Sequence, residues 1–171
     1  LRETDLKRIL AFGTVSQLGL LTVALGFGTR DAALAGLALL ISHALFKSCL
    51  FLVVGVIDRQ LSTRDIRELS GVGKQAPVMA TVSIVAVASM MGVIPTVGFV
   101  AKEGVLTAML DASAGGSAWG LIAFIVIGIG SVLTVAYGVR FIWGAFWTKP
   151  NTEKTPWPDP PTGVLAAPAV P

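Results

Sequence analysis

The sequence is poor in charged residues and in the residues that form disulfides or metal sites. Only 13% of its 171 residues are Asp, Glu, Lys or Arg, which is about half the share found in soluble domains. One cysteine, Cys49, and one histidine, His43, exclude an internal disulfide and a cysteine/histidine metal cluster. The net charge of +3 is spread over short connections without a basic stripe, so nucleic acid is excluded as a partner.

Apolar residues make up 54% of the chain, and they predict an all-α integral membrane protein. A spanning helix needs about 20 mostly apolar residues, and four stretches meet this requirement, at about 9–28, 32–57, 77–110 and 119–147. The chain begins at Leu1, in a charged stretch without a signal-peptide pattern. We therefore expect a fragment of a longer protein.

The third stretch is too long for one continuous helix. At a rise of about 1.5 Å per residue it would extend ~50 Å, well beyond the ~30 Å hydrocarbon core. A break is predicted in MGVIPTVGFVAKE, where Pro95 lacks a backbone donor and Gly92 and Gly98 accept unusual conformations. This predicts either one discontinuous crossing or two crossings joined at Pro95.

The distribution of basic residues favours one crossing. A single crossing places ten Lys and Arg residues on one side of the membrane and only Arg30 on the other, whereas two crossings give seven against four. Because cytoplasmic connections are enriched in Lys and Arg, the amino terminus, the 58–76 loop and the carboxyl terminus are predicted to be cytoplasmic. Six of the nine prolines follow residue 150, which predicts an extended tail or linker over 150–171.

Two ionisable side chains of the segment HALFKSC lie at membrane depth. Lys47 is the sixteenth residue of the 26-residue apolar stretch, and a charge near the centre of a spanning helix costs about 2.5–3.5 kcal/mol. His43 stands four residues earlier, on the same helical face. Because burial disfavours a charged lysine, we hypothesise that both residues relay protons; the alternative is that Lys47 permanently pairs with an acid on another helix.

Lys102 follows the predicted break by seven residues. Broken helices expose backbone polar groups at mid-membrane and are common at transporter ion sites, so Lys102 is predicted to lie at membrane depth beside the break. The alternative places Lys102 and Glu103 as an exposed pair in a surface loop. No Ser/His/Asp set or carboxylate pair with hydrolase spacing is present, and we expect neither an enzyme nor a cofactor.

Weaker polar signals occur in the first and last spans. They are Thr14, Ser16, Gln17, Ser131, Thr134 and Tyr137. Such residues usually hydrogen-bond a neighbouring helix, and a hydrated proton path is the alternative interpretation.

Three motifs, in order, resemble a known family. DLKRILAFGTVSQLG, HALFKSCLFLVVG and GFVAKEGVL resemble the antiporter-like module shared by respiratory complex I and the multisubunit Mrp-type cation/proton antiporters. VVGVIDRQLSTRDIREL is similar to the A-subunit branch of the Mrp antiporters. The similarity extends from about residue 3 to residue 149.

The resemblance implies a position and a role for the predicted site. The chain would form part of the second of two inverted repeats, with His43 and Lys47 at its central proton-translocation site and Lys102 at the end of the path. Ser42 and Glu103 are possible supporting residues. Leu39 stands where the family often has a second histidine, so water or the Ser42 hydroxyl would have to bridge that gap.

The resemblance also implies an activity and partners. We expect a fragment of an antiporter subunit that exchanges protons for Na⁺ or another monovalent cation, in a hetero-oligomeric complex in the cell membrane. One alternative is a proton-pumping membrane subunit of an NADH-quinone oxidoreductase of the complex I type. A second alternative is a structural membrane scaffold with immobile charges.

Overall fold

The computed structural model describes residues 2–150, 153 and 155–157. The elements in this part of the chain are all helices: α1 (Leu6–Gly26), α2 (Arg30–Leu61), α3 (Val72–Gln75), α4 (Pro77–Met91), α5 (Val97–Ala114) and α6 (Ala118–Phe146). By length and composition α1, α2 and α6 can cross a membrane, and α4 is a shorter apolar helix. The prediction of a multi-pass, all-α membrane protein is confirmed.

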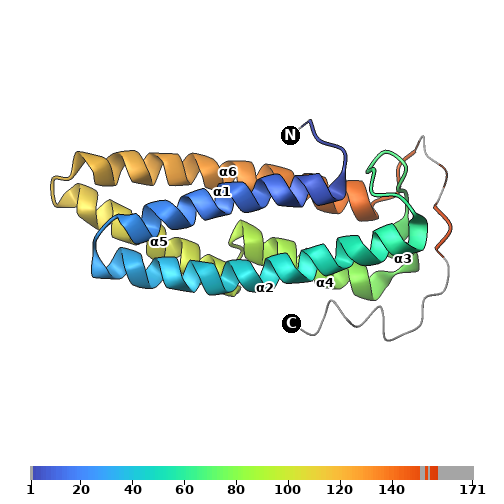
Figure 1. Cartoon of the computed structure of the whole chain (residues 1–171), viewed down its shortest axis with the longest axis horizontal. Coiled ribbons are helices and arrows are strands. Elements are labelled where there is room, and N and C mark those ends of the chain that lie inside the picture. The colour runs from blue at the N-terminus through green and yellow to red at the C-terminus, as the bar shows by residue number, and fades with distance from the viewer. Residues whose placement is uncertain (1, 151–152, 154, 158–171) are drawn as a thin grey trace.

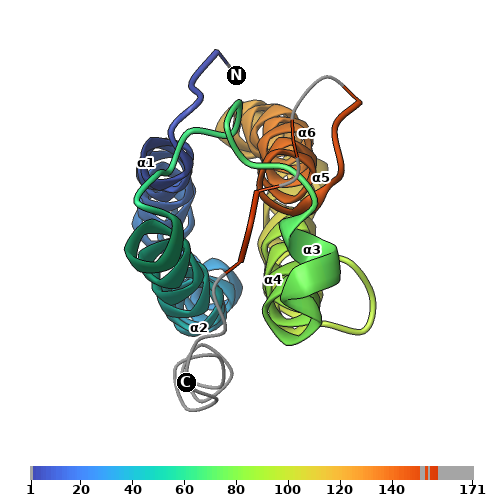
Figure 2. The same cartoon turned by 90° about the vertical axis from the view of Figure 1, so that its right-hand side faces the viewer.

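The third segment is one discontinuous crossing. In Figure 1, α4 ends halfway along the bundle, and α5 continues from there toward the far end, where α6 begins. Viewed along the bundle, α1 and α2 form one layer against a second layer of α4, α5 and α6 (Figure 2). The break predicted within MGVIPTVGFVAKE is confirmed, and it lies at 92–96.

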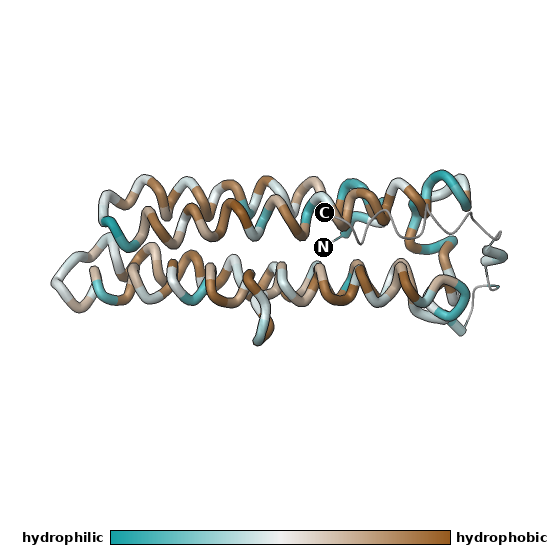
Figure 3. The backbone as a smooth tube through the Cα atoms, turned by 90° about the horizontal axis from the view of Figure 1, so that it is seen from below, coloured by the Kyte–Doolittle hydropathy of each residue, from teal (hydrophilic) through white to brown (hydrophobic). Residues whose placement is uncertain are grey.

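One end of the bundle collects the charged connections. The start of α1, the connection between α2 and α4 and the end of α6 lie together there (Figure 1), and we call this the charged end. The connections at 27–29 and 115–117 form the opposite end. Figure 3 shows hydrophobic residues along most of the helical length and hydrophilic residues concentrated toward the connections.

Local side-chain bonds fix where the helices begin. Asp5, Thr29, Thr96 and Ser117 each accept a hydrogen bond from a backbone N–H of the first helical turn, as N-cap residues do. Helix α2 extends beyond the predicted 32–57 in both directions and ends at Leu61, followed by the C-cap residue Ser62, whose φ is 53°. Hydropathy marks where the apolar stretch ends, whereas the helix continues through a polar last turn.

Two hydrophobic clusters fill the bundle at different depths. The first lies toward the charged end and includes Leu10, Phe46, Leu50, Met90 and Phe141. The second lies toward the opposite end and includes Ala24, Ala32, Leu39, Ala101 and Val105. The polar segment Ser42–His43 of α2 falls between them, so the polar residues at mid-depth separate two apolar cores.

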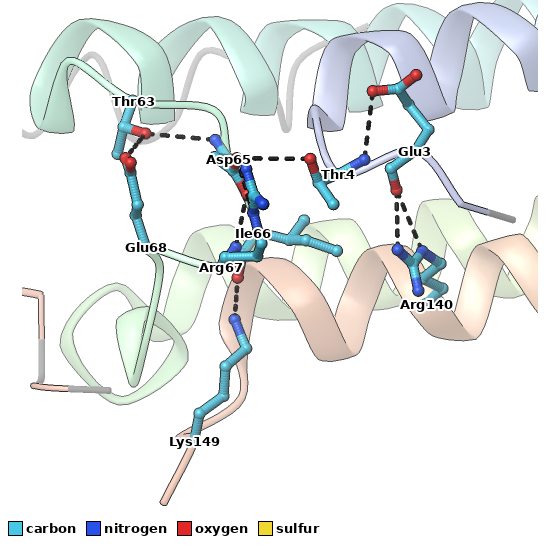
Figure 4. Close-up of polar contacts among 9 residues, drawn as sticks. All are labelled: Glu3, Thr4, Thr63, Asp65, Ile66, Arg67, Glu68, Arg140 and Lys149. Atoms are coloured by element: carbon cyan, nitrogen blue, oxygen red, sulfur yellow. Dashed lines mark hydrogen bonds and ion pairs between the residues drawn. The ribbon is translucent and has the colours of Figure 1, made fainter. Parts of the chain in front are cut away.

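The connection between α2 and α4 is fastened to the end of α6. The Lys149 ammonium donates to the backbone carbonyls of Ile66, Leu69 and Gly144, and Figure 4 shows it reaching the main chain at Ile66. Gly144 makes room for the Ile66 side chain, because a Cβ at position 144 would lie 2.7 Å from Ile66 Cγ2. Burial lowers the pKa of Lys149, an effect that nearby Asp65 opposes.

The same connection contacts the segment before α1 (Figure 4). Thr4 Oγ1 donates to Asp65 Oδ2 over 3.4 Å, and Arg67 Nη2 donates to the same oxygen over 2.6 Å. Hydrogen bonds from Arg67 lower the pKa of Asp65 to about 2. Arg140 Nη2 of α6 donates to the Glu3 carbonyl over 2.9 Å, so the charged end ties together three segments distant in sequence.

The described part of the predicted tail packs back on this connection. The Thr155 N–H donates to the Ser70 carbonyl over 3.1 Å, and the Trp157 N–H donates to Gln75 Oε1 over 3.0 Å. The remainder of the predicted tail, including 158–171, lies outside the described residues.

Candidate functional site at mid-membrane

Lys47 is buried in the interior of the bundle. Its side chain is on α2 and the residue is 5% exposed. The ammonium donates to the Leu10 carbonyl of α1 over 2.9 Å, and Thr14 Oγ1 donates to the same oxygen over 3.0 Å. The ammonium also lies 5.8 Å from the centroid of the Tyr137 ring of α6, within the range of a cation–π interaction. Three helices therefore meet at Lys47.

Lys102 occupies the break in the third segment. The residue is 7% exposed, and its ammonium donates to the Met91 carbonyl over 3.3 Å. Met91 is the last residue of α4, where unpaired carbonyls carry partial negative charge that favours a cation. The alternative of a surface loop for Lys102 does not fit this burial.

The break depends on two glycines. Gly92 ends α4 with a φ of 83°, a conformation that residues with a Cβ rarely adopt. Gly98 of α5 lies against the end of α4, where a Cβ would be 1.8 Å from the Ser89 carbonyl oxygen. The absence of a side chain at Gly92 leaves room for Lys102, whose Cδ would lie 3.2 Å from a Cβ there. The Lys102 ammonium can therefore reach the Met91 carbonyl.

Neither lysine has an acidic partner in the part of the chain that the structure describes. The four ion pairs there involve Glu3, Asp5, Asp58 and Asp65, all at the charged end. Glu103 follows Lys102 in sequence but is exposed on another face of α5. The described structure therefore shows no contact with Lys102 that would support the predicted role of Glu103. Both buried ammonium groups are instead bound to backbone carbonyls.

His43 and Ser42 have unsatisfied polar atoms. The His43 ring stands edge-on to Phe46, with centroids 5.3 Å apart, and its Nδ1 is buried without a protein hydrogen bond. Ser42 Oγ is also buried and unpaired. Leu39, one turn earlier, packs in the second hydrophobic cluster. Buried polar atoms are nearly always hydrogen-bonded, so these two atoms require partners that the described part of the chain does not supply.

Other polar groups in the bundle join α1 to α6. Gln17 Nε2 donates to Thr134 Oγ1 over 3.1 Å, and both residues are buried. The prediction that these residues hydrogen-bond between helices is confirmed for this pair. Tyr137, whose hydroxyl donates to Met90 Sδ over 3.4 Å, was not predicted as a neighbour of Lys47, because sequence spacing on α6 carries no information about α2.

No group of three potential metal-ligating acid, His or Cys residues occurs among the described residues. The chemistry that the mid-membrane groups can perform is the binding and transfer of protons, since lysine and histidine side chains both gain and lose them. The arrangement takes its groups from α1, α2, α4, α5 and α6.

The sequence and the fold are both similar to those of known membrane proteins. Residues 1–134 match the family model described as NADH:quinone oxidoreductase/Mrp antiporter, TM. The A subunit of the Na(+)/H(+) antiporter of Bacillus subtilis (strain 168) is 36% identical over 99% of this chain, which covers 23% of that protein.

Two solved structures share the fold. A chain of the Mrp complex from Dietzia sp. DQ12-45-1b superposes with a TM-score of 0.77 and 30% identity, over 91% of this chain and 28% of that one. A chain of the membrane-bound sulfane sulfur reductase, an archaeal respiratory membrane complex, gives a TM-score of 0.82 and 26% identity, over 98% and 27%. The chain spans about a quarter of the length of the relatives it matches.

Proposed function

The chain belongs to the NADH:quinone oxidoreductase/Mrp antiporter transmembrane family, and on this premise we propose that it contributes a proton-translocation site to a cation/proton antiporter. The site consists of Lys47, His43 and Lys102, and the cation is Na⁺ or another monovalent cation. The observation that carries the proposal is the binding of both buried lysines to backbone carbonyls without an acidic partner in the described chain.

Carbonyl partners suit a lysine that must release its proton. A buried ion pair would stabilise the charged lysine, and removing one charge from such a pair costs about 3–5 kcal/mol. A carbonyl accepts a strong, charge-assisted hydrogen bond from the ammonium and a weaker one from the neutral amine, which still has N–H groups. Lys47 and Lys102 can therefore change protonation state without losing their contacts. A scaffold with immobile charges would instead be expected to surround them with carboxylates.

The distance between the two lysines requires intermediate carriers. A Cβ on Gly104 of α5 would lie 3.2 Å from Ala35 Cβ of α2, and the two helices are antiparallel (Figure 1). This contact aligns the helices and places the backbones of Lys47 and Lys102 about 15 Å apart along the bundle at helical rise. His43 lies between them, and its unpaired Nδ1 offers a site for the bridging water that Leu39 cannot provide.

The rest of the activity belongs to a larger assembly. Because the chain spans about a quarter of the relatives' length, we propose that it is part of the second inverted repeat and acts with other antiporter subunits. The complex would lie in the lipid bilayer of the cell membrane, with the charged end and both termini of the chain in the cytoplasm, as the basic residues predict.

A second candidate is a proton-pumping subunit of a redox-driven membrane complex. It is favoured by the TM-score of 0.82 with a chain of an archaeal respiratory membrane complex. In that case the same lysines would transfer protons, but the driving reaction would take place in other subunits. The two candidates differ in whether exchange requires an electron donor.

The test is cation/proton exchange in inverted membrane vesicles that contain the complete complex. Lys47→Ala in the full-length subunit is compared with Ser48→Ala, whose side chain is exposed on the same helix and bonds only within it. Loss of Na⁺-induced proton movement in Lys47→Ala alone, with unchanged copurification of the other subunits, supports the proposal. Retained exchange in Lys47→Ala would mean that Lys47 has only a structural role. Exchange that appears only with an electron donor would favour the redox-driven candidate.

A further inference from the structure

Tyr137 of α6 is positioned by two glycines. A Cβ at Gly13 of α1 would lie 2.8 Å from Tyr137 Cζ and 2.9 Å from its hydroxyl oxygen. A Cβ at Gly138 of α6 would lie 3.1 Å from Val87 Cγ1 and 3.3 Å from Met91 Cγ, both on α4. Because neither glycine has a side chain, α6 approaches both α1 and the end of α4 closely at the level of Tyr137.

The ring of Tyr137 contacts Lys47 in the opposite layer of the bundle. Helix α6 belongs to one layer and α2 to the other (Figure 2), and the Lys47 ammonium lies over the ring at 5.8 Å from its centroid. The ring quadrupole attracts a cation in this position, and the attraction is stronger where water is excluded. The neutral amine carries no charge to be attracted. The ring is therefore held more firmly over Lys47 when this residue carries its proton.

The hydroxyl of Tyr137 contacts the helix that binds Lys102. It donates to Met90 Sδ over 3.4 Å, and Met90 is fully buried in the first hydrophobic cluster. The next residue, Met91, ends α4, and its carbonyl accepts the hydrogen bond from the Lys102 ammonium. One aromatic side chain thus contacts Lys47 through its ring and, through its hydroxyl, the helical turn to which Lys102 is bound.

The last turn of α4 is able to transmit a displacement. The last carbonyls of a helix have no helical N–H partner, so the position of the Met91 carbonyl depends on its neighbours. A movement at Met90 reaches this carbonyl through one main-chain link. The bond from Lys102 to the carbonyl is already long at 3.3 Å, and hydrogen bonds of this length weaken further when stretched.

Other groups around Lys47 do not make this connection. His43 is a titratable neighbour on the same helix, and α1 contributes the Leu10 carbonyl and the Thr14 hydroxyl. Within the described chain, Tyr137 is the residue that combines a cation–π contact with Lys47 and a hydrogen bond to α4.

We propose that Tyr137 is a positioning residue that couples the charge on Lys47 to the carbonyl that binds Lys102. While Lys47 is protonated, the ring stays over the ammonium and the hydroxyl holds the last turn of α4. Loss of the proton releases the ring and, through Met90, the Met91 carbonyl. Coupling between two sites is reciprocal, so the charge on Lys102 also affects Lys47. The proposal rests on the proposed role of both lysines in proton transfer.

A double-mutant cycle tests the contact between Tyr137 and α4. Cation/proton exchange is measured in vesicles that contain the complete complex, for Tyr137→Phe, Met90→Leu and the double variant. Tyr137→Phe keeps the ring but removes the hydroxyl, and Met90→Leu keeps the volume but removes the sulfur. Because Thr134 and Gln17 also lie near the hydroxyl, Met90→Leu isolates the bond to α4.

The expected result is a loss that is not additive. Each single variant should lower the initial exchange rate about threefold, which is the size of one ordinary hydrogen bond. The double variant should lower the rate no further than either single variant, because both changes remove the same contact. Equal copurification of the other subunits ensures that the variants are compared in the assembled complex.

The matched control is Met79→Leu, which lies on the same helix. Met79 is 0% exposed, as Met90 is, and its hydrogen bond from Ser83 Oγ uses the main-chain carbonyl, which leucine retains. Met79→Leu should therefore exchange at the rate of the parent. An equal loss in Met79→Leu and Met90→Leu would assign the effect to the packing of α4 and overturn the proposal.

The pH dependence of exchange distinguishes coupling from a structural role. Tyr137→Leu removes the ring and should shift the pH profile by roughly half a pH unit, the size of an ordinary cation–π interaction. Tyr137→Phe retains the ring over Lys47 and should shift the profile less. A purely structural role would instead lower the rate by the same factor at every pH.

Two further outcomes would overturn the proposal. Additive losses in the double variant would mean that the Tyr137 hydroxyl and the Met90 sulfur act independently. An unmoved pH profile in Tyr137→Leu would mean that the ring only fills space. Lys47→Ala is measured in parallel: if it abolishes exchange, either outcome removes the role of Tyr137 and leaves the proposed function intact, whereas retained exchange in Lys47→Ala refutes the proposed function itself.

Discussion

Replacement of Gly98 by alanine tests the geometry of the broken helix. A Cβ at this position would lie 1.8 Å from the Ser89 carbonyl oxygen and 2.7 Å from its carbon. An ordinary contact needs 3.4 Å, so the end of α4 and the start of α5 must separate by roughly 1.6 Å along that line. Neither Ser89 nor Gly98 can move alone, because the main chain of each belongs to a helix.

The separation also weakens the bonds that cross the break. The Gly98 N–H donates to Ser89 Oγ over 3.3 Å, and the Lys102 ammonium donates to the Met91 carbonyl over 3.3 Å, so neither bond tolerates a further stretch. Overpacking costs about 1–3 kcal/mol, and a hydrogen bond to a charged group contributes about 1.5–3 kcal/mol. We therefore expect Gly98→Ala to destabilise the folded subunit by about 3 kcal/mol.

The assay is the midpoint of thermal unfolding of the detergent-solubilised complex, together with cation/proton exchange in vesicles. The matched control is Gly55→Ala on α2, which is exposed and would place its Cβ with nothing within 4 Å. Alanine favours a helix over glycine by up to about 1 kcal/mol, so the control should melt no lower than the parent. If Gly98→Ala unfolds at the same temperature as Gly55→Ala and exchanges normally, the described packing at the break is wrong.

Further predictions concern the charged end. Lys149→Met removes the donor that binds three backbone carbonyls and should destabilise the protein by about 2 kcal/mol. Faster proteolysis within 62–71 would report this loss. Protection equal to that of the parent would argue against a stabilising role of the three Lys149 hydrogen bonds. The pKa of Asp65 is lowered from 3.8 to about 2, so its contribution to stability is present above pH 3.8 and is lost as the pH falls through 2. Arg67→Ala should flatten the dependence of the thermal midpoint on pH in that window, and an unchanged dependence would assign it to other carboxyl groups.

Several features could be predicted from the sequence because they depend on local chemistry. The apolar stretches define the membrane segments, since the hydrocarbon core requires about 20 residues for each crossing. Pro95 and Gly92 predict the break, and Lys47 and Lys102 are conspicuous because charges inside apolar stretches are rare. The family predicted from three motifs is confirmed by the match over residues 1–134. The ends of α2 and α5 were the least accurate boundaries, because both helices continue about four residues past the predicted apolar stretches, to Leu61 and Ala114.

The partners of these residues were decided only by the tertiary structure. The binding of Lys47 to the Leu10 carbonyl, its position over the Tyr137 ring and the docking of Ile66 against Gly144 join segments distant in the chain. Helical periodicity gives the face on which a residue lies but not the helix that faces it. The sequence by itself therefore determined which groups lie at membrane depth, and packing of the helices determined that the lysines bind carbonyls rather than carboxylates.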